Sequence, residues 1–340
     1  MLATTPPDAA PAPGDRDAAQ VLVGPAGTVP ATLSVVVCCY TMDRWDDVVR
    51  GLHSLADQRR RPDQVVVVVD HNDELLDRVR SLVVDVPLAV DVVTNAGQRG
   101  LSGARNTGVA ASTGDVIAFL DDDASADPGW VADLLAGYRD PDVWGVGGAA
   151  DPDWGGDAPA WFPAEFGWVV GCSYTGQPEQ PAPVRNFLGC NMSFRREVFD
   201  EVGGFREGIG RVGTKPVGCE ETELCIRLRQ AHPEARLVYD PAVRVRHRVS
   251  ADRHAFAYFR ARCAAEGRSK AQVTDEVGAG DALATERAYT SRVLPAGVAR
   301  GVRDALRGDG AGARRAGAIT VGLVWTAAGY AAGRLGRGTS

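Results

Sequence analysis

The fold class is decided by the stretch Val116-Ile117-Ala118-Phe119-Leu120-Asp121-Asp122-Asp123, which joins five apolar residues directly to three carboxylates. A continuous apolar run is typical of a strand that is covered on both faces. In open α/β sheets, ligands bind outside the carboxyl ends of the strands. Like charges packed this closely repel one another, so a cation is expected among them. A divalent cation holding a phosphate meets that need, and the stretch therefore predicts a metal and diphosphate site.

Three further strand-like segments precede this one and alternate with helical patterns. They cover residues 33–39, 65–69 and 90–93, and the second is a run of five valines. Apolar residues at helical spacing follow each of them, as expected for amphipathic helices. Strands that alternate with helices predict an α/β protein with a mostly parallel central sheet flanked by helices.

Local signals predict several element boundaries. Asp43 is expected to cap the helix after the first strand. Asp127-Pro128 supplies an N-cap and a proline in the first turn, so a helix should begin there. Residues 186–194 are expected to form a strand, and residues 220–230 a helix whose acidic start lies at its positive end.

Composition separates the two ends of the chain from its centre. Residues 1–31 are rich in Ala, Pro, Asp and Gly and are expected to be a disordered leader. Residues 251–340 are expected to be a helical C-terminal extension. Its apolar run 316–333 is shorter than the ~20 residues that span a bilayer. An interfacial or protein-packed helix is therefore expected, and arginines within 314–337 could contact a membrane surface.

The bulk composition excludes several classes of protein. A formal net charge of -7 argues against a nucleic-acid binder, for which a basic surface is expected. Seven cysteines without a CxxC pair predict neither a zinc cluster nor a disulfide framework. We therefore expect a cytoplasmic protein, peripheral on the inner face of the cell membrane if the C-terminal extension reaches it.

Six motifs occur in the order known from one enzyme family. They are residues 35–40, 67–70, 103–108, 119–123, 189–196 and 218–224. Each is weak alone, but together they resemble glycosyltransferase family 2, which has the GT-A fold. The resemblance implies one domain over 32–250, with a nucleotide-sugar half (32–150) and an acceptor half (151–250). It also implies inverting transfer from a nucleotide-diphosphate sugar, favouring UDP, to a hydroxyl of a glycan or lipid-linked acceptor.

The resemblance gives roles to the acidic residues at the strand ends. Asp121 matches the position that contacts the ribose, and Asp123 the position that binds Mn²⁺ or Mg²⁺. Asp122 is grouped with the nucleotide-sugar residues, but it is expected to point away and to be the most replaceable of the three. Asp70 matches the position that hydrogen-bonds the uracil edge. The alternative for Asp70 is a turn that caps the following helix.

Further residues match the nucleotide and metal shells of the family. Tyr40 and Thr41 match residues that line the base pocket. Arg105 matches an arginine near the nucleotide, and Arg99 lies close upstream; a salt bridge to a sheet-end aspartate is the alternative for Arg105. His247 matches a late histidine of the metal or phosphate shell, and imidazole suits Mn²⁺. A purely structural histidine is the alternative.

The pair Glu220-Glu221 is the second predicted site. The family usually has Glu-Asp here, and the Asp removes the proton of the acceptor hydroxyl. Glu221 matches that Asp with a side chain longer by one methylene, which leaves both Glu221 and Glu220 as candidate bases. The alternative is a structural role, because acidic residues are favoured at a helix N-terminus.

Two stretches could meet the acceptor. Residues 151–186 are rich in Pro, Gly and aromatic residues and would form either an acceptor wall or an aromatic-anchored surface loop. Residues 260–270 resemble a segment of family members that act on lipid-linked acceptors, and their basic face could meet phosphate headgroups. A solvated helix face is the alternative.

Three other protein classes share parts of this pattern. A phosphohydrolase would use Asp121 and Asp123 as nucleophile and acid, but it would leave the third aspartate unexplained. A metal-dependent nucleotidyltransferase usually has a Gly-rich loop with Arg or Lys after its first strand, and residues 39–42 have none. A lectin-like binder would not need Glu220-Glu221.

Overall fold

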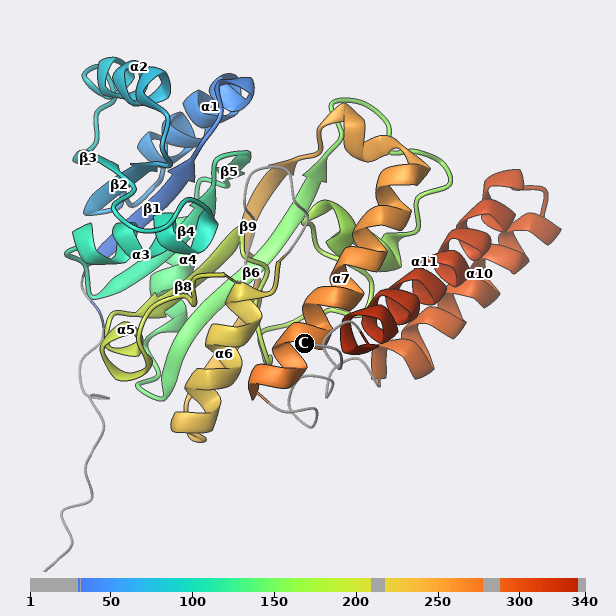
Figure 1. Ribbon diagram of the computed structural model, residues 1–340. Coiled ribbons are helices and arrows are strands. Elements are labelled where there is room, and N and C mark those ends of the chain that lie inside the picture. Colours follow the sequence, from blue (N-terminus) through green and yellow to red (C-terminus); the bar gives the residue numbers. More distant parts are fainter. Residues whose placement is uncertain (1–29, 31, 209–217, 278–287, 336–340) are drawn as a thin grey trace, which may run out of the picture.

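The computed structural model describes residue 30 and residues 32–208, 218–277 and 288–335, and the predicted leader thus lies almost wholly outside the described residues (Figure 1). The strands are β1 (Leu33–Cys39), β2 (Gln64–Val69), β3 (Val90–Thr94), β4 (Val116–Asp121), β5 (Ala124–Ala126), β6 (Val143–Asp153), β7 (Ala182–Pro183), β8 (Asn191–Arg195) and β9 (Arg236–Arg248). The helices are α1 (Trp45–Ala56), α2 (Asp73–Val83), α3 (Leu101–Ala111), α4 (Trp130–Gly137), α5 (Glu197–Val202), α6 (Glu220–Ala231), α7 (Phe256–Val277), α10 (Leu294–Leu306) and α11 (Gly310–Leu335). Short helical turns are η1 (Met42–Arg44), η2 (Ala164–Val170), η3 (Ala251–His254) and η4 (Tyr289–Val293).

The strands form one mixed sheet in the order β3-β2-β1-β4-β8-β6-β9-β5, with β7 paired to β9. The first four of these strands are parallel, as predicted, and β8 enters antiparallel between β4 and β6. Cys38 pairs with Asp121, and Cys39 with Val69. This register brings the carboxyl ends of β1, β2 and β4 to one edge of the sheet.

Side chains of the parallel strands alternate between two buried layers. Val35 and Val37 pack on the face covered by α1, α2 and α4, whereas Val36 packs on the face covered by α3, α5 and α6. The five valines of β2 alternate in the same way. Burying one such side chain contributes about 1.5–3 kcal/mol, and this explains why these strands are apolar at every position.

Three predicted boundaries are wrong in detail. Asp43 lies inside η1, because the side chain of Thr41 accepts its N–H and begins a turn before α1. α4 begins at Trp130 with Gly129 at its N-cap, since the Asp127 carbonyl accepts the Trp130 N–H in a preceding turn. β8 begins at Asn191 rather than at residue 186, because the Asn191 N–H is bonded to the Leu188 carbonyl in a turn.

The C-terminal region is helical, as predicted, and α7, α10 and α11 lie together away from α1 and α2 (Figure 1). Glycines explain how closely α7 and α11 approach. A Cβ on Gly267 would lie 2.1 Å from the Thr326 carbonyl oxygen, and one on Gly329 would lie 2.1 Å from that of Ala264. The Ala- and Gly-rich composition therefore serves helix–helix packing.

Among the described residues, α11 is the one helix whose length and composition would allow it to cross a membrane. The most apolar part of α11 has a mean hydropathy of 1.2, and 28% of that part is buried inside the protein. Leu323, Val324 and Trp325 remain exposed on it. Such a helix is weak evidence for a membrane span.

Candidate active site

A small cavity lies where β1, β2 and β4 end. Its lining residues are Cys38, Cys39, Tyr40, Arg44, Asp70, Gly100, Leu101, Ala104, Asp121 and Asp122. Four residues predicted for the nucleotide sugar thus come together here, although they come from three separate strand ends. Thr41 and Arg99 do not line this cavity.

Asp70 is buried and held by three donors. Its Oδ1 accepts from Asn95 Nδ2 at 2.7 Å and lies 2.8 Å from His71 Nδ1, while its Oδ2 accepts from the Gly100 N–H at 2.9 Å. The capping alternative for the segment 70–73 is observed through Asn72, which caps α2 by accepting from the Leu75 N–H, and Asp70 itself does not make the cap. Asp70 is therefore a rigid acceptor at the cavity wall.

Thr41 and Arg99 make structural contacts instead. Thr41 Oγ1 accepts from the Asp43 N–H at 3.2 Å. Arg99 Nη2 donates to the His71 carbonyl at 2.9 Å from an exposed position. Their predicted roles at the nucleotide remain predictions.

The three aspartates differ in their surroundings. Asp122 is 4% exposed, lines the cavity and lies 2.5 Å from Arg44 Nη1, so the expectation that it points away is wrong, while its ready replacement stays a prediction. Asp123 is also buried and is surrounded by Arg44 at 3.2 Å, His247 at 3.1 Å and Arg253 at 3.5 Å. Buried carboxylates need such partners, because desolvation of an unpaired charge is costly.

Charge pairing decides which of these groups ionise. Burial alone would lower the pKa of His247, but the adjacent Asp123 outweighs it and raises this pKa to about 10. Burial would raise the pKa of Asp123, yet His247, Arg44 and Arg253 hold it well below its usual range. Burial raises the pKa of Asp122 to about 7 despite Arg44. Of Asp122 and Asp123, Asp123 is therefore the firmly anionic one.

Asp121, Asp123 and His247 fit a divalent cation. One ligand atom from each can be chosen so that all three lie within 4.8 Å of one another. Asp123 Oδ1 is buried and accepts no hydrogen bond from any described residue, although it faces His247 Nε2. Two carboxylates and an imidazole form a donor set that suits Mn²⁺.

Arg105 connects this edge to the second predicted site. Its Nη1 donates to Glu220 Oε1 at 2.8 Å, and its Nη2 donates to Asp121 Oδ1 at 3.3 Å and to the Gly189 carbonyl at 2.9 Å. The guanidinium is buried against the rings of Phe119 and Phe205. The salt-bridge alternative for Arg105 is thus observed.

Glu220 and Glu221 differ sharply although they are adjacent. Glu220 is buried and committed to Arg105 through Oε1, while its Oε2 has no hydrogen-bond partner among the described residues. Glu221 is half-buried, and its Oε1 accepts from Thr222 Oγ1 at 3.3 Å. Burial, and then the charge of Glu220, raise the pKa of Glu221 to about 8. A carboxyl group with a pKa raised to this range can exchange a proton near neutral pH, which makes Glu221 a candidate base.

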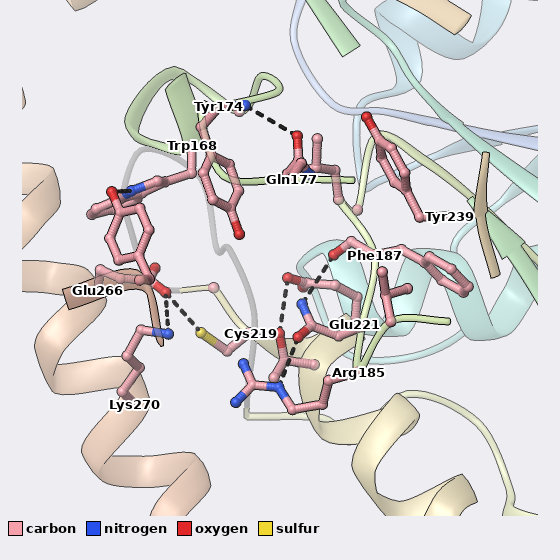
Figure 2. Close-up of a pocket in the computed structure, with 18 of the residues that line it drawn as sticks. Trp168, Tyr174, Gln177, Arg185, Phe187, Cys219, Glu221, Tyr239, Glu266 and Lys270 are labelled. Atoms are coloured by element: carbon pink, nitrogen blue, oxygen red, sulfur yellow. Dashed lines mark hydrogen bonds and ion pairs between the residues drawn. The ribbon is translucent and has the colours of Figure 1, made fainter. Parts of the chain in front are cut away.

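A cavity of about 960 Å³ opens in front of both glutamates. Asp121, His247 and Arg253 are among its lining residues, and Trp168, Tyr174, Tyr239 and Tyr289 supply aromatic walls. Figure 2 shows Glu221 at one side of this cavity, with Trp168 and Tyr174 across from it. Only part of the aromatic-rich stretch 151–186 lines this cavity, because Trp154, Trp161 and Phe162 pack into a buried layer with Phe259.

Two arginines of the site are absent from the sequence predictions. Arg44 follows the first strand by five residues and pairs with two aspartates, and Arg253 precedes α7. Charge balance in the sequence could have predicted a cation such as Arg44, since three adjacent carboxylates require nearby cations. Arg253 has no comparable signal, because it is brought to Asp123 across 130 residues of chain.

The chain is similar in sequence to a known family and to one of its members. The sequence model described as "Glycosyl transferase family 2" matches residues 34–203. The glucosyl-dolichyl phosphate glucuronosyltransferase of Haloferax volcanii is 41% identical over 241 residues, which cover 70% of this chain and 76% of that protein.

Two solved structures share the fold. The mannosyltransferase PcManGT of Pyrobaculum calidifontis, in complex with GDP-Man and Mn²⁺, has a TM-score of 0.55 at 18% identity and covers 88% of each chain. GalNAc-T7 with UDP, GalNAc and Mn²⁺ has a TM-score of 0.50 at 18% identity, over 77% of this chain and 56% of that chain. Their metal ions support a divalent cation in this fold. The chain belongs to glycosyltransferase family 2, and it is a glycosyltransferase with the GT-A fold.

Proposed function

We propose that the protein transfers a sugar from a UDP-sugar to a hydroxyl group of a lipid-linked acceptor, with inversion at the anomeric carbon. The observation that carries this proposal is the bridge from Asp121 through Arg105 to Glu220. Asp121 and His247, which we propose for the cation, line the same cavity as the paired glutamates, and this supports a shared site. Donor and acceptor would meet there.

The donor end would hold the nucleoside diphosphate. Asp121, Asp123 and His247 would bind Mn²⁺ or Mg²⁺, which when bound supplies Lewis-acid stabilisation of the diphosphate. Asp70, fixed by its donors, and Tyr40 would contact the base, and Asp121 the ribose. Arg105 would act indirectly, because its Nη1 and Nη2 already donate to Glu220, Asp121 and the Gly189 carbonyl.

Glu221 would be the general base. It lines the cavity, and its raised pKa favours proton transfer near neutral pH. The deprotonated acceptor oxygen would attack the anomeric carbon from the face opposite the diphosphate. A single displacement of this kind inverts the carbon, as in enzymes where one carboxylate activates the incoming nucleophile. Glu220, held by Arg105, would position the start of α6.

The acceptor is proposed to be lipid-linked on two grounds. Leu323 and Tyr330 of α11 line the same cavity, so an apolar chain could leave along this helix. The Haloferax volcanii relative is named for a dolichyl phosphate acceptor. We propose a peripheral location on the cytoplasmic face of the membrane, with the arginines of 314–337 near the lipid surface.

The test is incubation with UDP-, GDP- and dTDP-sugars, Mn²⁺ and a polyprenyl-phosphate-linked sugar acceptor. We expect acceptor-dependent UDP release, and proton NMR of the product should show the anomeric configuration opposite to that of the donor. Glu221→Gln should abolish transfer, whereas the exposed control Glu234→Gln should not. A product with retained configuration, or transfer by Glu221→Gln at the normal rate, would refute the mechanism.

A further inference from the structure

Three aromatic side chains that line the large cavity come from two distant parts of the chain. Trp168 and Tyr174 belong to η2 and the loop after it, whereas Tyr289 begins η4 in the C-terminal region. All three are half-buried and line the cavity that also contains Glu221. The family model ends at residue 203, so Tyr289 contributes to this wall from outside the matched region.

Hydrogen bonds hold Tyr289 against Trp168. Trp168 Nε1 donates to the Tyr289 hydroxyl oxygen at 3.1 Å, and this hydroxyl donates to the Glu165 carbonyl oxygen at 2.6 Å. The ring of Tyr289 meets that of Tyr174 edge to face, with the two centroids 5.7 Å apart. An indole has one donor and no acceptor, so the polar group of Trp168 is already satisfied within the protein. Trp168 therefore offers a ligand its carbon surface.

α10 fixes the position of Tyr289 relative to η2. Glu165 of η2 is buried, and its carboxylate pairs with Arg300 of α10. A Cβ on Gly297 would lie 2.2 Å from Glu165 Oε1, so the backbone of α10 approaches η2 closely. The Leu294 N–H reaches the Tyr289 carbonyl, which makes η4 a π-helical turn at the start of α10. Such turns are rare, and they occur frequently at functional sites.

The two sides of the cavity differ in chemistry. Figure 2 shows Glu221 across the cavity from Trp168 and Tyr174. A carboxylate accepts hydrogen bonds from hydroxyl groups, whereas the aromatic side offers carbon surface. A pyranose ring matches both, because its hydroxyl groups lie around its edge and its axial C–H bonds form an apolar face. A hydrocarbon chain in the same place would cover Glu221 without giving it a donor, and burying a polar group in this way is costly.

We propose that Trp168 is the platform on which a sugar ring of the acceptor stacks, and that Tyr289 is the positioning residue that holds its indole in place. This inference rests on the proposed function, because it names the chemical class of the acceptor group that faces Glu221. That group is a pyranose ring rather than the lipid itself. Trp168 binds the ring through contact area, and Tyr289 acts through Trp168. Neither residue takes part in bond formation.

The test measures binding of the methyl glycosides of glucose, galactose, mannose and N-acetylglucosamine to the full chain, without donor, by saturation-transfer difference NMR. At least one should bind, with the strongest saturation on its ring C–H protons. Trp168→Ala should weaken this binding at least ~10-fold, the scale of truncating an aromatic anchor. Tyr258→Phe, which removes the hydroxyl of a half-buried tyrosine that does not line the cavity, should leave it unchanged. Thermal unfolding followed by circular dichroism establishes that each variant is folded.

A double-mutant cycle separates positioning from a general structural role. Tyr289→Phe keeps the ring but removes the hydroxyl to which Trp168 donates, and it should weaken glycoside binding ~3–10-fold, the scale of one hydrogen bond. Trp168→Phe keeps an aromatic ring without the N–H group. In that background Tyr289→Phe should cost little more, because the two residues act as a unit. Additive losses would overturn the positioning role of Tyr289.

The sugar platform is overturned if none of the glycosides binds, or if Trp168→Ala keeps their affinity. It is also overturned if geranylgeraniol displaces the bound glycoside competitively, because the aromatic side would then hold a hydrocarbon chain.

These outcomes are separate from those of the proposed function. Binding is measured without a nucleotide sugar, so an enzyme that uses no tested donor could still show stacking on Trp168. Transfer to a lipid-linked sugar by Trp168→Ala at an unchanged KM for the acceptor would overturn this inference alone.

Discussion

Arg105 Nη1 lies 2.8 Å from Glu220 Oε1, although 115 positions of sequence separate the two residues. The same guanidinium reaches Asp121 at 3.3 Å, so one buried cation joins the donor edge to the start of α6. Burial favours the neutral form of Arg105, but Glu220 and Asp121 outweigh it and raise the pKa of Arg105. Arg105 therefore stays charged, and it links the end of β4 to the start of α6.

Replacing Arg105 should destabilise the protein strongly. Arg105→Met leaves Glu220 buried without its cation, and breaking a buried pair costs about 3–5 kcal/mol. Urea unfolding should show this loss, and Arg105→Met/Glu220→Gln should recover part of it. Arg99→Met, at an exposed arginine, should change the free energy of unfolding by less than about 0.5 kcal/mol. Equal stability of Arg105→Met and the unaltered protein would contradict the buried bridge.

The transfer rate should rise with pH through about 8. Glu221 has its pKa raised to about 8, and a general base acts only when deprotonated, so activity is lost as pH falls below this value. The measurement is kcat/KM between pH 6 and 10. Glu221→Asp should retain part of the activity, because the family usually has Asp at this position, and Glu221→Gln should show no such rise. A rate that is independent of pH over this range would exclude Glu221 as the base.

Asp123 should dominate Mn²⁺ affinity. Asp123→Asn would remove an oxygen of the proposed metal site, and since changes to outer-shell partners already cost ~10–100-fold, we expect a loss of at least that size. Electron paramagnetic resonance of free Mn²⁺ measures the affinity after the protein is treated with EDTA. The matched control is Asp77→Asn, whose carboxylate is 82% exposed. Unchanged Mn²⁺ binding by Asp123→Asn would remove Asp123 from the metal shell.

Two glycines of α11 should respond oppositely to alanine. Gly329→Ala places a methyl group 2.1 Å from the Ala264 carbonyl oxygen, so α7 and α11 must separate and the free energy of unfolding should fall. A Cβ on Gly317 meets nothing within 4 Å, so Gly317→Ala should be neutral or should stabilise by up to about 1 kcal/mol through helix propensity. Thermal unfolding distinguishes them. Equal midpoints would contradict the close contact of the two helices.

Local chemistry was sufficient to predict the donor half of the fold. Apolar runs at 33–39 and 65–69 have no polar side to expose, so they had to be covered on both faces, as β1 and β2 are. Asp70 and Asp121 follow such runs directly, and parallel strands end at a common edge. Tyr40, Asp70 and Asp121 therefore meet as expected, and Asp122 joins them against expectation.

Tertiary structure alone decided the partners of the charges. Asp122 pairs with Arg44, and Arg105 pairs with Glu220 and Asp121. Asp123 pairs with Arg253, which lies 130 residues later in the chain. Helical spacing gives α7 a charged face, but only its packing against α6 and α11 directs that face into the cavity lined by Glu220 and Glu221. Periodicity and strand-end position are local properties of a sequence. The pairing of buried charges depends on which distant segments share a low-dielectric interior, and only the folded chain determines that.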